Sequence, residues 1–397
     1  MKEFTYFTPT KVVFGIGVSE RTGALLKEAG ASKVLLHYGG GSAERSGLLT
    51  KVRSHLQQAG IGFVELGGVK PNPRVSLIRE GIALARKEKV DFILAVGGGS
   101  VIDSAKAIGY GIPYDGDVWD FYNFKAVAKT ATPVAALLTL AAAGSEMSDS
   151  SVITNEEGWI KRGTNNNVCR CKLAIMDPQL TLSVSDYQTA CGSVDILMHT
   201  LERYFSAEKT LDLTDAIAEG LMRTVINNAL KLKENSQDIS ARAEIMWASS
   251  LSHNGLTGCG SGVGDWACHK LEHELSGLYD VAHGAGLAAI WSGWARYVYD
   301  TNPARFAQLA NRVFNIEGED ETSLALAGIC AMEDFFSEID MPACLNELKD
   351  DISDDEILLM AKKCVGSSPT GKVGGFRVLE EPDMIEVYKI ARTRLKK

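Results

Sequence analysis

Apolar residues in the first half of the chain form short runs, separated by longer stretches in which apolar positions recur with a helical period. The strands predicted from these runs are 11–14, 33–38, 63–66, 91–96 and 133–140. The helical stretches between them are 19–29, 43–59 and 74–88. Alternating strands and helices predict parallel βαβ units, which bind ligands at the carboxyl ends of their strands.

The pattern changes after about residue 186, where helical periodicity dominates and no strand alternation is evident. The clearest predicted helices are 187–206, 211–233, 239–254 and 322–338. A chain of 397 residues is also long for a single hydrophobic core. We therefore predict an α/β domain at 1–185 and an all-helical domain at 186–397.

Composition narrows the class of protein. Hydrophobic residues make up 45% and charged residues 23%, as in ordinary globular proteins. The net charge of −9 argues against nucleic-acid or anionic-membrane partners, which need basic surfaces. The sequence has neither an apolar run long enough to span a bilayer nor a signal-like start, so we expect a cytoplasmic protein. Eight cysteines in so long a chain do not indicate a disulfide framework.

Three consecutive glycines follow the predicted strand 91–96. Gly97, Gly98 and Gly99 lead into a helix that begins near Ser100 and Asp103. Glycines let the backbone approach a ligand closely, and the N-terminus of a helix favours an anion. The loop therefore predicts a site for a dinucleotide pyrophosphate, although a plain strand–turn–helix connection would have a similar pattern.

A second glycine loop follows the strand 33–38. In dinucleotide-binding folds an acidic residue near this place binds the adenosine ribose and selects NAD. Here the sequence has Gly39, Gly40, Gly41 and Ser42 and no carboxylate. The glycines leave room for a 2′-phosphate, and Ser42 supplies a hydroxyl that can donate to it. We therefore expect NADP(H) in preference to NAD(H), with a flexible loop as the alternative.

The histidines are clustered with the spacing of metal ligands. Asp195 and His199 are four residues apart, as are His269 and His273, so each pair shares one face of a helix. His283 follows fourteen residues after His269. One carboxylate with several imidazoles suits Fe(II) or Zn(II). Any one of these histidines alone could serve packing, and the spacing does not distinguish His269 from His273 as a ligand.

These motifs, in this order, resemble those of the iron-containing (group III) alcohol dehydrogenases, especially the butanol dehydrogenase-like aldehyde reductases. The resemblance covers nearly the whole chain. The segments that carry it are 9–15, 97–106, 138–140, 144–146, 177–178, 195–199, 269–273 and 283–284. It implies an N-terminal dinucleotide-binding α/β domain and a C-terminal all-α metal-binding domain, a fold shared with dehydroquinate synthase. It also implies a homodimer.

The resemblance also implies roles for individual residues. The metal ligands would be Asp195, His199, His269 and His283. His273 would lie near the nicotinamide and the substrate, as a candidate proton relay. The residues expected to contact the cofactor are Gly39, Gly40, Ser42, Gly97, Gly98, Gly99, Ser100, Asp103, Thr139, Leu140, Ser145 and Lys161.

The expected reaction is hydride transfer between a nicotinamide cofactor and a small alcohol or aldehyde, with the metal polarising the substrate oxygen. One alternative is a lyase of the dehydroquinate synthase kind, which would need basic residues for a phosphorylated substrate. The other is a non-catalytic protein that binds a dinucleotide or a metal.

Overall fold

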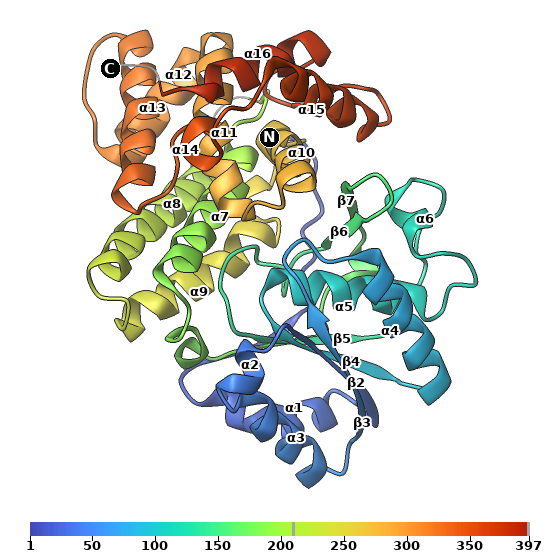
Figure 1. Cartoon of the computed structure of the whole chain (residues 1–397). Coiled ribbons are helices and arrows are strands. Elements are labelled where there is room, and N and C mark those ends of the chain that lie inside the picture. Colours follow the sequence, from blue (N-terminus) through green and yellow to red (C-terminus); the bar gives the residue numbers. More distant parts are fainter. Residues whose placement is uncertain (209–210, 395–397) are drawn as a thin grey trace. The chain divides into compact units, whose positions relative to one another are not determined.

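The computed structural model describes residues 1–208 and 211–394. The chain forms two compact units, one of Phe7–Val184 and one of Met1–Tyr6 together with Ser185–Lys397 (Figure 1). The first unit is built on a parallel sheet and the second is helical, which confirms the predicted fold class. The six N-terminal residues group with the helical unit, where the main-chain nitrogen of Lys2 donates to the oxygen of Gly260 at 2.9 Å.

Six parallel strands form the central sheet of the first unit, in the order β1-β8-β5-β4-β2-β3. Their bounds are β1 Lys11–Phe14, β2 Lys33–Gly39, β3 Gly62–Val69, β4 Phe92–Gly97, β5 Val134–Leu138 and β8 Leu173–Met176. The central strand β4 is buried along its whole length, as parallel strands covered on both faces are. The carboxyl ends of β2, β4 and β5 carry the glycine loops and the segment at Thr139.

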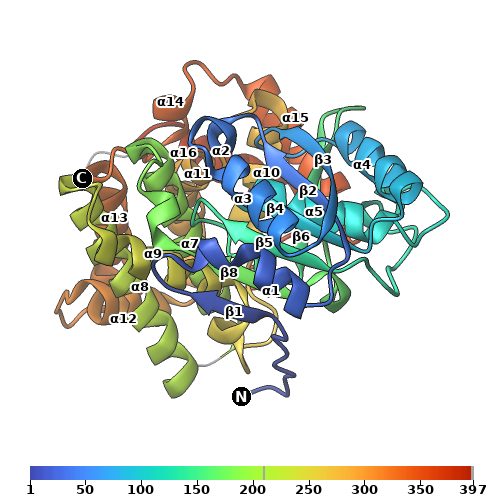
Figure 2. The same cartoon turned by 90° about the horizontal axis from the view of Figure 1, so that it is seen from below.

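Helices cover both faces of this sheet. One face carries α1 (Thr22–Glu28) and α3 (Leu48–Gln58), and Figure 2 views the unit from that side. Alternate strand residues such as Val34, Leu36 and Leu94 pack there in one hydrophobic cluster with these helices. The other face carries α4 (Val75–Glu88) and α5 (Gly99–Gly111), as Figure 1 shows. The period of two along each strand thus supplies apolar residues to both layers.

The structure departs from the sequence prediction at four places in this unit. The strand β8 and an antiparallel hairpin of β6 (Ser150–Asn155) and β7 (Ile160–Asn165) were not predicted. The helix predicted at 43–59 is divided into α2 (Ser42–Arg45) and α3. The division falls at Gly47, whose φ of 77° lies in the left-handed region that glycine adopts without strain. A short helix, α6 (Trp119–Tyr122), precedes β5.

After β8, the regular elements that the structure describes are all helical. The longer helices are α7 Asp186–Tyr204, α8 Asp212–Glu234, α9 Ile239–His253, α10 Ala267–Tyr279, α11 His283–Val298, α12 Pro303–Phe314, α13 Glu321–Glu338, α15 Asp354–Gly366 and α16 Glu381–Arg392. A four-residue helix, α14 Leu345–Leu348, lies between α13 and α15. The core of this unit contains large buried aromatic residues, among them Trp291, Trp294 and Phe306. None of the helices in the described ranges is both long and apolar enough to cross a bilayer.

Candidate metal centre and cofactor loops

Two of the candidate metal ligands lie on α7, which begins where the Ser185 side chain accepts a hydrogen bond from the Gln188 backbone. Asp195 and His199 are one turn apart on this helix and are both nearly fully buried. The Nδ1 atom of His199 lies 3.1 Å from Asp195 Oδ1. The i, i+4 spacing therefore does place a carboxylate and an imidazole together on one helix face, as the sequence predicted.

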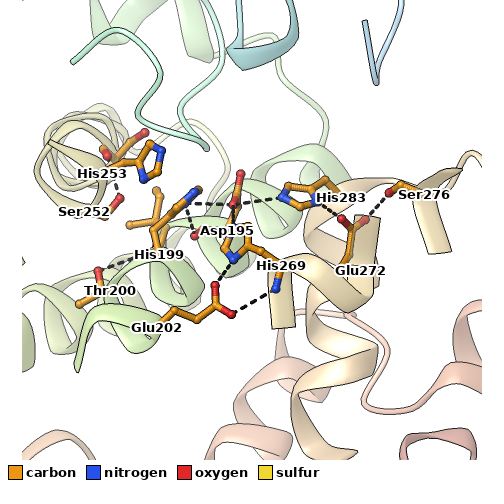
Figure 3. Close-up of polar contacts among 12 residues, drawn as sticks. Asp195, His199, Thr200, Glu202, Ser252, His253, His269, Glu272, Ser276 and His283 are labelled. Atoms are coloured by element: carbon orange, nitrogen blue, oxygen red, sulfur yellow. Dashed lines mark hydrogen bonds and ion pairs between the residues drawn. The ribbon is translucent and has the colours of Figure 1, made fainter. Parts of the chain in front are cut away.

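The other two candidate ligands approach the same carboxylate from neighbouring helices (Figure 3). His269 lies on α10, and its Nε2 atom is 3.7 Å from Asp195 Oδ1. His283 is the first residue of α11, and its Nε2 atom is 3.8 Å from the same oxygen. The structure thus brings together four residues that are up to 88 positions apart (283 − 195) in the chain.

Two buried polar atoms in this cluster have no hydrogen-bond partner among the described residues: Asp195 Oδ1 and His269 Nε2. Buried polar atoms are nearly always satisfied, and an unsatisfied one often marks the place of a ligand or ion. Ligand atoms of Asp195, His199 and His269 all lie within 4.8 Å of one another. The residues present therefore fit a divalent metal of the Fe(II) or Zn(II) type.

Burial and the close charges shift the pKa values of these ligands. Burial alone would raise the pKa of Asp195, but His199 and His283 hold it well below its usual value. Burial lowers the pKa of His199 to about 4, against the opposing effect of Asp195. Burial would also lower the pKa of His269, but Glu202 and Asp195 raise it to about 9. Near neutral pH, Asp195 is thus ionised and His199 neutral, the forms that bind metal, whereas His269 carries a proton that a metal ion would have to displace.

Two glutamates that the sequence analysis did not single out contact the histidine cluster. Glu202 accepts a hydrogen bond from Nδ1 of His269, and Glu272 accepts one from Nδ1 of His283. Both glutamates are fully buried. A signal was present in the sequence, since Glu202 lies seven residues after Asp195 and Glu272 three residues after His269, both helical spacings.

The structure also separates the two histidines that share a face of α10. His269 groups with Asp195 and His199, whereas His273 groups with Glu272 and His283. The ring of His273 lies 6.5 Å from that of His269 and 5.9 Å from that of His283. His273 is therefore beside the ligand cluster and one turn removed from its centre.

The first glycine loop lies between β4 and α5, where the sequence placed it. A Cβ atom added to Gly97 would lie 2.4 Å from Val101, and one added to Gly98 would lie 3.0 Å from Leu140. These glycines therefore allow close packing within the loop, besides the close approach to a ligand that the sequence suggested. Ser100 follows in the first turn of α5, at the N-terminal end that attracts anions.

Asp103 has a contact that the sequence did not reveal. Its carboxylate accepts a hydrogen bond from the Ser145 hydroxyl at 2.5 Å and one from the Val152 nitrogen at 2.9 Å. Asp103 thus fixes the loop that follows β5 and carries Ser145. The main-chain nitrogen of Thr139 donates to the oxygen of Gly97 at 3.1 Å, so the loops after β4 and β5 are adjacent.

The remaining residues expected to contact the cofactor lie in the loop after β5, on the hairpin of β6 and β7, and at the end of β2. Leu140 directly follows Thr139 and packs beside Gly98. Lys161 lies on β7 of the hairpin and is nearly fully buried. Gly39 ends β2, and Gly40 continues toward the short helix α2.

Charged residues surround the second glycine loop. Ser42 begins α2, and Arg45 at its end lies against Gly41, with a guanidinium nitrogen 2.9 Å from the position of an added Cβ. Arg53 pairs with both Glu44 and Glu65, at 2.9 Å in each case. Acidic residues therefore do lie beside this loop. The loop itself contains none, as expected from its sequence of Gly39, Gly40, Gly41 and Ser42.

The chain matches models of a known protein family over most of its length. Residues 9–178 match the family of iron-containing alcohol dehydrogenases, and residues 189–392 match the C-terminal region of the Fe-containing alcohol dehydrogenase family. The two matches correspond to the α/β unit and the helical unit.

Individual relatives cover nearly the whole chain. Probable NADH-dependent butanol dehydrogenase 1 of Bacillus subtilis is 42% identical over 392 residues, 98% of this chain and 99% of its own length. The crystal structure of NADH-dependent butanol dehydrogenase A from Thermotoga maritima has a TM-score of 0.96 at 39% identity and covers 99% of both chains. An NADPH-dependent aldehyde reductase of Escherichia coli is 33% identical over 87% of this chain and 89% of its own. The chain therefore belongs to the iron-containing alcohol dehydrogenases, metal-dependent oxidoreductases that act on CH–OH groups.

Proposed function

We propose that the protein interconverts small primary alcohols and aldehydes, butanol and butanal among them, using a nicotinamide cofactor and one divalent metal ion. The observation that carries the proposal is the convergence of three histidines on Asp195 in a chain of this dehydrogenase family. The names of the relatives supply butanol as the first substrate to test. Family membership leaves little support for a lyase or a non-catalytic binding protein.

In the proposed centre the metal is held by Asp195, His199, His269 and His283. Fe(II) and Zn(II) both suit this ligand set. When bound, the ion supplies Lewis-acid stabilisation of negative charge on the substrate oxygen. The buried carboxylate of Asp195 and the three imidazoles fix where that charge is stabilised, because each comes from a helix packed in the core of the unit.

The α/β unit is proposed to bind the cofactor through its loops. The backbone of Gly97, Gly98 and Gly99 with Ser100 receives the pyrophosphate at the N-terminus of α5. Asp103 holds Ser145 in place, and Ser145 contacts the nicotinamide side together with Thr139 and Leu140. Lys161 contacts a ribose of the cofactor. The cofactor itself stores the hydride, and these residues orient it.

His273 is proposed to contact the nicotinamide and substrate and to carry the proton that alcohol oxidation releases. Its support is its position beside the proposed ligands, with its ring 6.5 Å from that of His269 and 5.9 Å from that of His283. An imidazole can accept a proton from one partner and pass it to another, which a relay requires.

For the cofactor we propose NADH over NADPH, a revision of the preference inferred from the glycine loop alone. A 2′-phosphate adds negative charge, and the four charged side chains described beside the loop carry no net positive charge to receive it. Glu44 and Glu65 balance Arg45 and Arg53, and both carboxylates are paired with Arg53. The two more similar relatives described above are also named NADH-dependent.

The homodimer and the cytoplasmic location stay predictions. The apolar residues Phe7, Phe14 and Ile16 are exposed on the α/β unit, close to the edge strand β1. They are candidates for burial in a dimer, which light scattering on the purified protein would detect.

The deciding experiment measures the metal content of the purified protein and the oxidation of NADH or NADPH with butanal, with and without added Fe(II) or Zn(II). We expect metal-dependent oxidation of NADH, faster than that of NADPH. Faster use of NADPH would keep the reaction and overturn the cofactor proposal. Activity with neither cofactor on a panel of alcohols and aldehydes, in protein that holds its metal, would overturn the proposed reaction.

A further inference from the structure

We infer that Glu202 and Glu272 are positioning residues that hold His269 and His283 in the orientation needed to bind the metal, and that Glu202 has the larger effect. The inference rests on the metal centre of the proposed function. It concerns residues that make no contact with the ion, and its test measures metal binding directly.

Glu202 holds His269 at two points. One carboxylate oxygen, Oε2, accepts a hydrogen bond from Nδ1 of the His269 ring. The other, Oε1, accepts one from the main-chain nitrogen of His269 at 3.1 Å. Glu202 belongs to α7, the helix of Asp195 and His199, so this one side chain links the ligands of α7 to the ligand of α10.

Glu272 holds His283 in a similar way from α10. Its Oε2 atom accepts a hydrogen bond from Nδ1 of His283, and its Oε1 atom accepts one from the Ser276 hydroxyl. Gly286 on α11 leaves the space that the carboxylate occupies, because a Cβ atom there would lie 2.9 Å from both Cγ and Oε1 of Glu272. Figure 3 shows this chain of contacts from Ser276 to His283.

The chemistry of the imidazole explains why these contacts matter for metal binding. A ring that donates a proton from Nδ1 presents the lone pair of Nε2, so the carboxylate selects both the tautomer and the ring orientation. For His269 and His283 the Nε2 atoms are the ones directed toward Asp195. A carboxylate partner also makes the imidazole a stronger electron donor to a metal.

The third histidine provides an internal contrast. Nδ1 of His199 donates to the main-chain oxygen of Asp195 at 2.9 Å, so its tautomer is fixed by its own helix without a carboxylate. Among the three histidines, the two glutamates therefore contact His269 and His283 and not His199. Removing either should weaken metal binding and leave the Asp195–His199 pair in place.

The two glutamates should differ in the size of their effects. Both oxygens of Glu202 bind one residue, and the His269 side chain is 8% exposed. Glu272 divides its oxygens between His283 and Ser276, and the His283 side chain is 26% exposed. Water can replace part of the lost contact at His283 but hardly any at His269.

The test compares Glu202→Gln and Glu272→Gln with a matched control, Glu219→Gln. Glu219 is also buried in the helical unit, where it accepts hydrogen bonds from the Tyr204 hydroxyl at 3.1 Å and from Gln308 at 2.7 Å. The Kd for Zn(II) is measured by competition with a chromophoric chelator, and folding by circular dichroism. Ser276→Ala is a milder variant that removes the hydroxyl donating to Glu272, together with its longer hydrogen bond of 3.4 Å to the main-chain oxygen of Val281.

We expect the Kd for Zn(II) to rise by about 10- to 100-fold in the two site variants, more for Glu202→Gln, as is typical when the carboxylate partner of a metal-binding histidine is removed. Glu219→Gln should match the unmodified protein, and Ser276→Ala should show a smaller rise. Unchanged Zn(II) affinity in folded Glu202→Gln and Glu272→Gln would overturn the inference. If Glu202→Gln fails to fold, Glu272→Gln and Ser276→Ala decide it. Failure of the unmodified protein to bind Zn(II) or Fe(II) would instead count against the proposed function.

Discussion

Nδ1 of His199 donates to the main-chain oxygen of Asp195, 2.9 Å away and one helical turn earlier. This contact joins two candidate metal ligands through the backbone of α7. It leaves the Nε2 atom of His199 as the ring nitrogen able to bind an ion. The carboxylate oxygen of Asp195 to which the other two histidines point has no hydrogen bond among the described residues. The side chains of the cluster are thus fixed in position, and Asp195 Oδ1 has the capacity to bind an ion.

The first prediction tests that capacity at Asp195. Asp195→Asn keeps the size of the side chain and removes its charge, so it removes an anionic ligand without creating a cavity. We expect the Kd for Zn(II) to rise by more than about 100-fold, beyond the effect of losing an outer carboxylate. Metal analysis after dialysis measures the loss, and circular dichroism checks the fold. Full retention of metal in the folded variant would exclude Asp195 as a ligand.

The fold was predictable where apolar runs and helical periods were long. The strands β2 and β4 and the helices α7, α8 and α9 lie close to their predicted bounds. The four-residue strand β8 was missed because it directly follows a polar, cysteine-containing stretch, whereas the equally short β1 was predicted. Its place between β1 and β5 depends on contacts distant in the chain, which local patterns do not encode.

The ligand cluster was predictable for a different reason. Histidine is rare in this chain, so pairs at helical spacing stand out. Glu202 and Glu272 did not stand out in the sequence, because glutamate is common on helices and its side chain is usually solvated. Only the packing of α7, α10 and α11 shows that these two glutamates are buried against imidazole rings.

The second prediction concerns His273. Because His273 lies beside the ligand cluster, His273→Ala should leave the metal bound and lower turnover by about 100-fold, the lower end of the usual contribution of a proton-transferring residue. Metal analysis and steady-state kinetics with butanol measure the two effects separately. His55→Ala is the control, since His55 lies on α3 in the α/β unit and its Nε2 atom faces Glu20 at 3.3 Å. Loss of metal from the His273 variant would contradict the proposed role.

The third prediction concerns the choice between NADH and NADPH. Glu44→Ala removes one of the two carboxylates paired with Arg53 and leaves the other, on Glu65. The ratio of kcat/KM for NADPH to that for NADH should rise by about twofold to fivefold, the range expected for one exposed charge. Arg45→Ala, which removes the cation lying against Gly41, should lower the same ratio. If neither variant changes the ratio, the charges beside this loop do not select the cofactor.

The fourth prediction concerns the glycine loop after β4. In Gly98→Ala the new methyl group would lie 3.0 Å from Cβ of Leu140, so the loop or Leu140 must move. We expect weaker NADH binding, seen as a higher Kd in fluorescence titrations, with metal content unchanged. Gly366→Ala is the control, because a methyl group there meets no atom within 4 Å. Equal NADH affinity in both variants would argue that this loop does not approach the pyrophosphate.

The last prediction concerns the pH dependence of stability and rests on His37, a histidine of the α/β unit. His37 on β2 is fully buried, with Nδ1 donating to the oxygen of Leu66 and Nε2 2.8 Å from the Ser104 hydroxyl. Burial lowers the pKa of His37 to about 4, so the folded protein keeps it neutral while the unfolded chain takes up a proton below about pH 6.5. The contribution of His37 to the free energy of unfolding should therefore be present at pH 7 and fall as the pH drops from about 6.5 to about 4. Between pH 7 and pH 5 the loss should be about 2 kcal/mol.

His37→Gln should lose this part of the pH dependence. Urea unfolding at pH 7 and at pH 5 gives the change in the free energy of unfolding for each protein. Because only this change is compared, a lower overall stability of the variant does not affect the result. Identical pH dependence would mean that His37 is not held neutral in the folded protein.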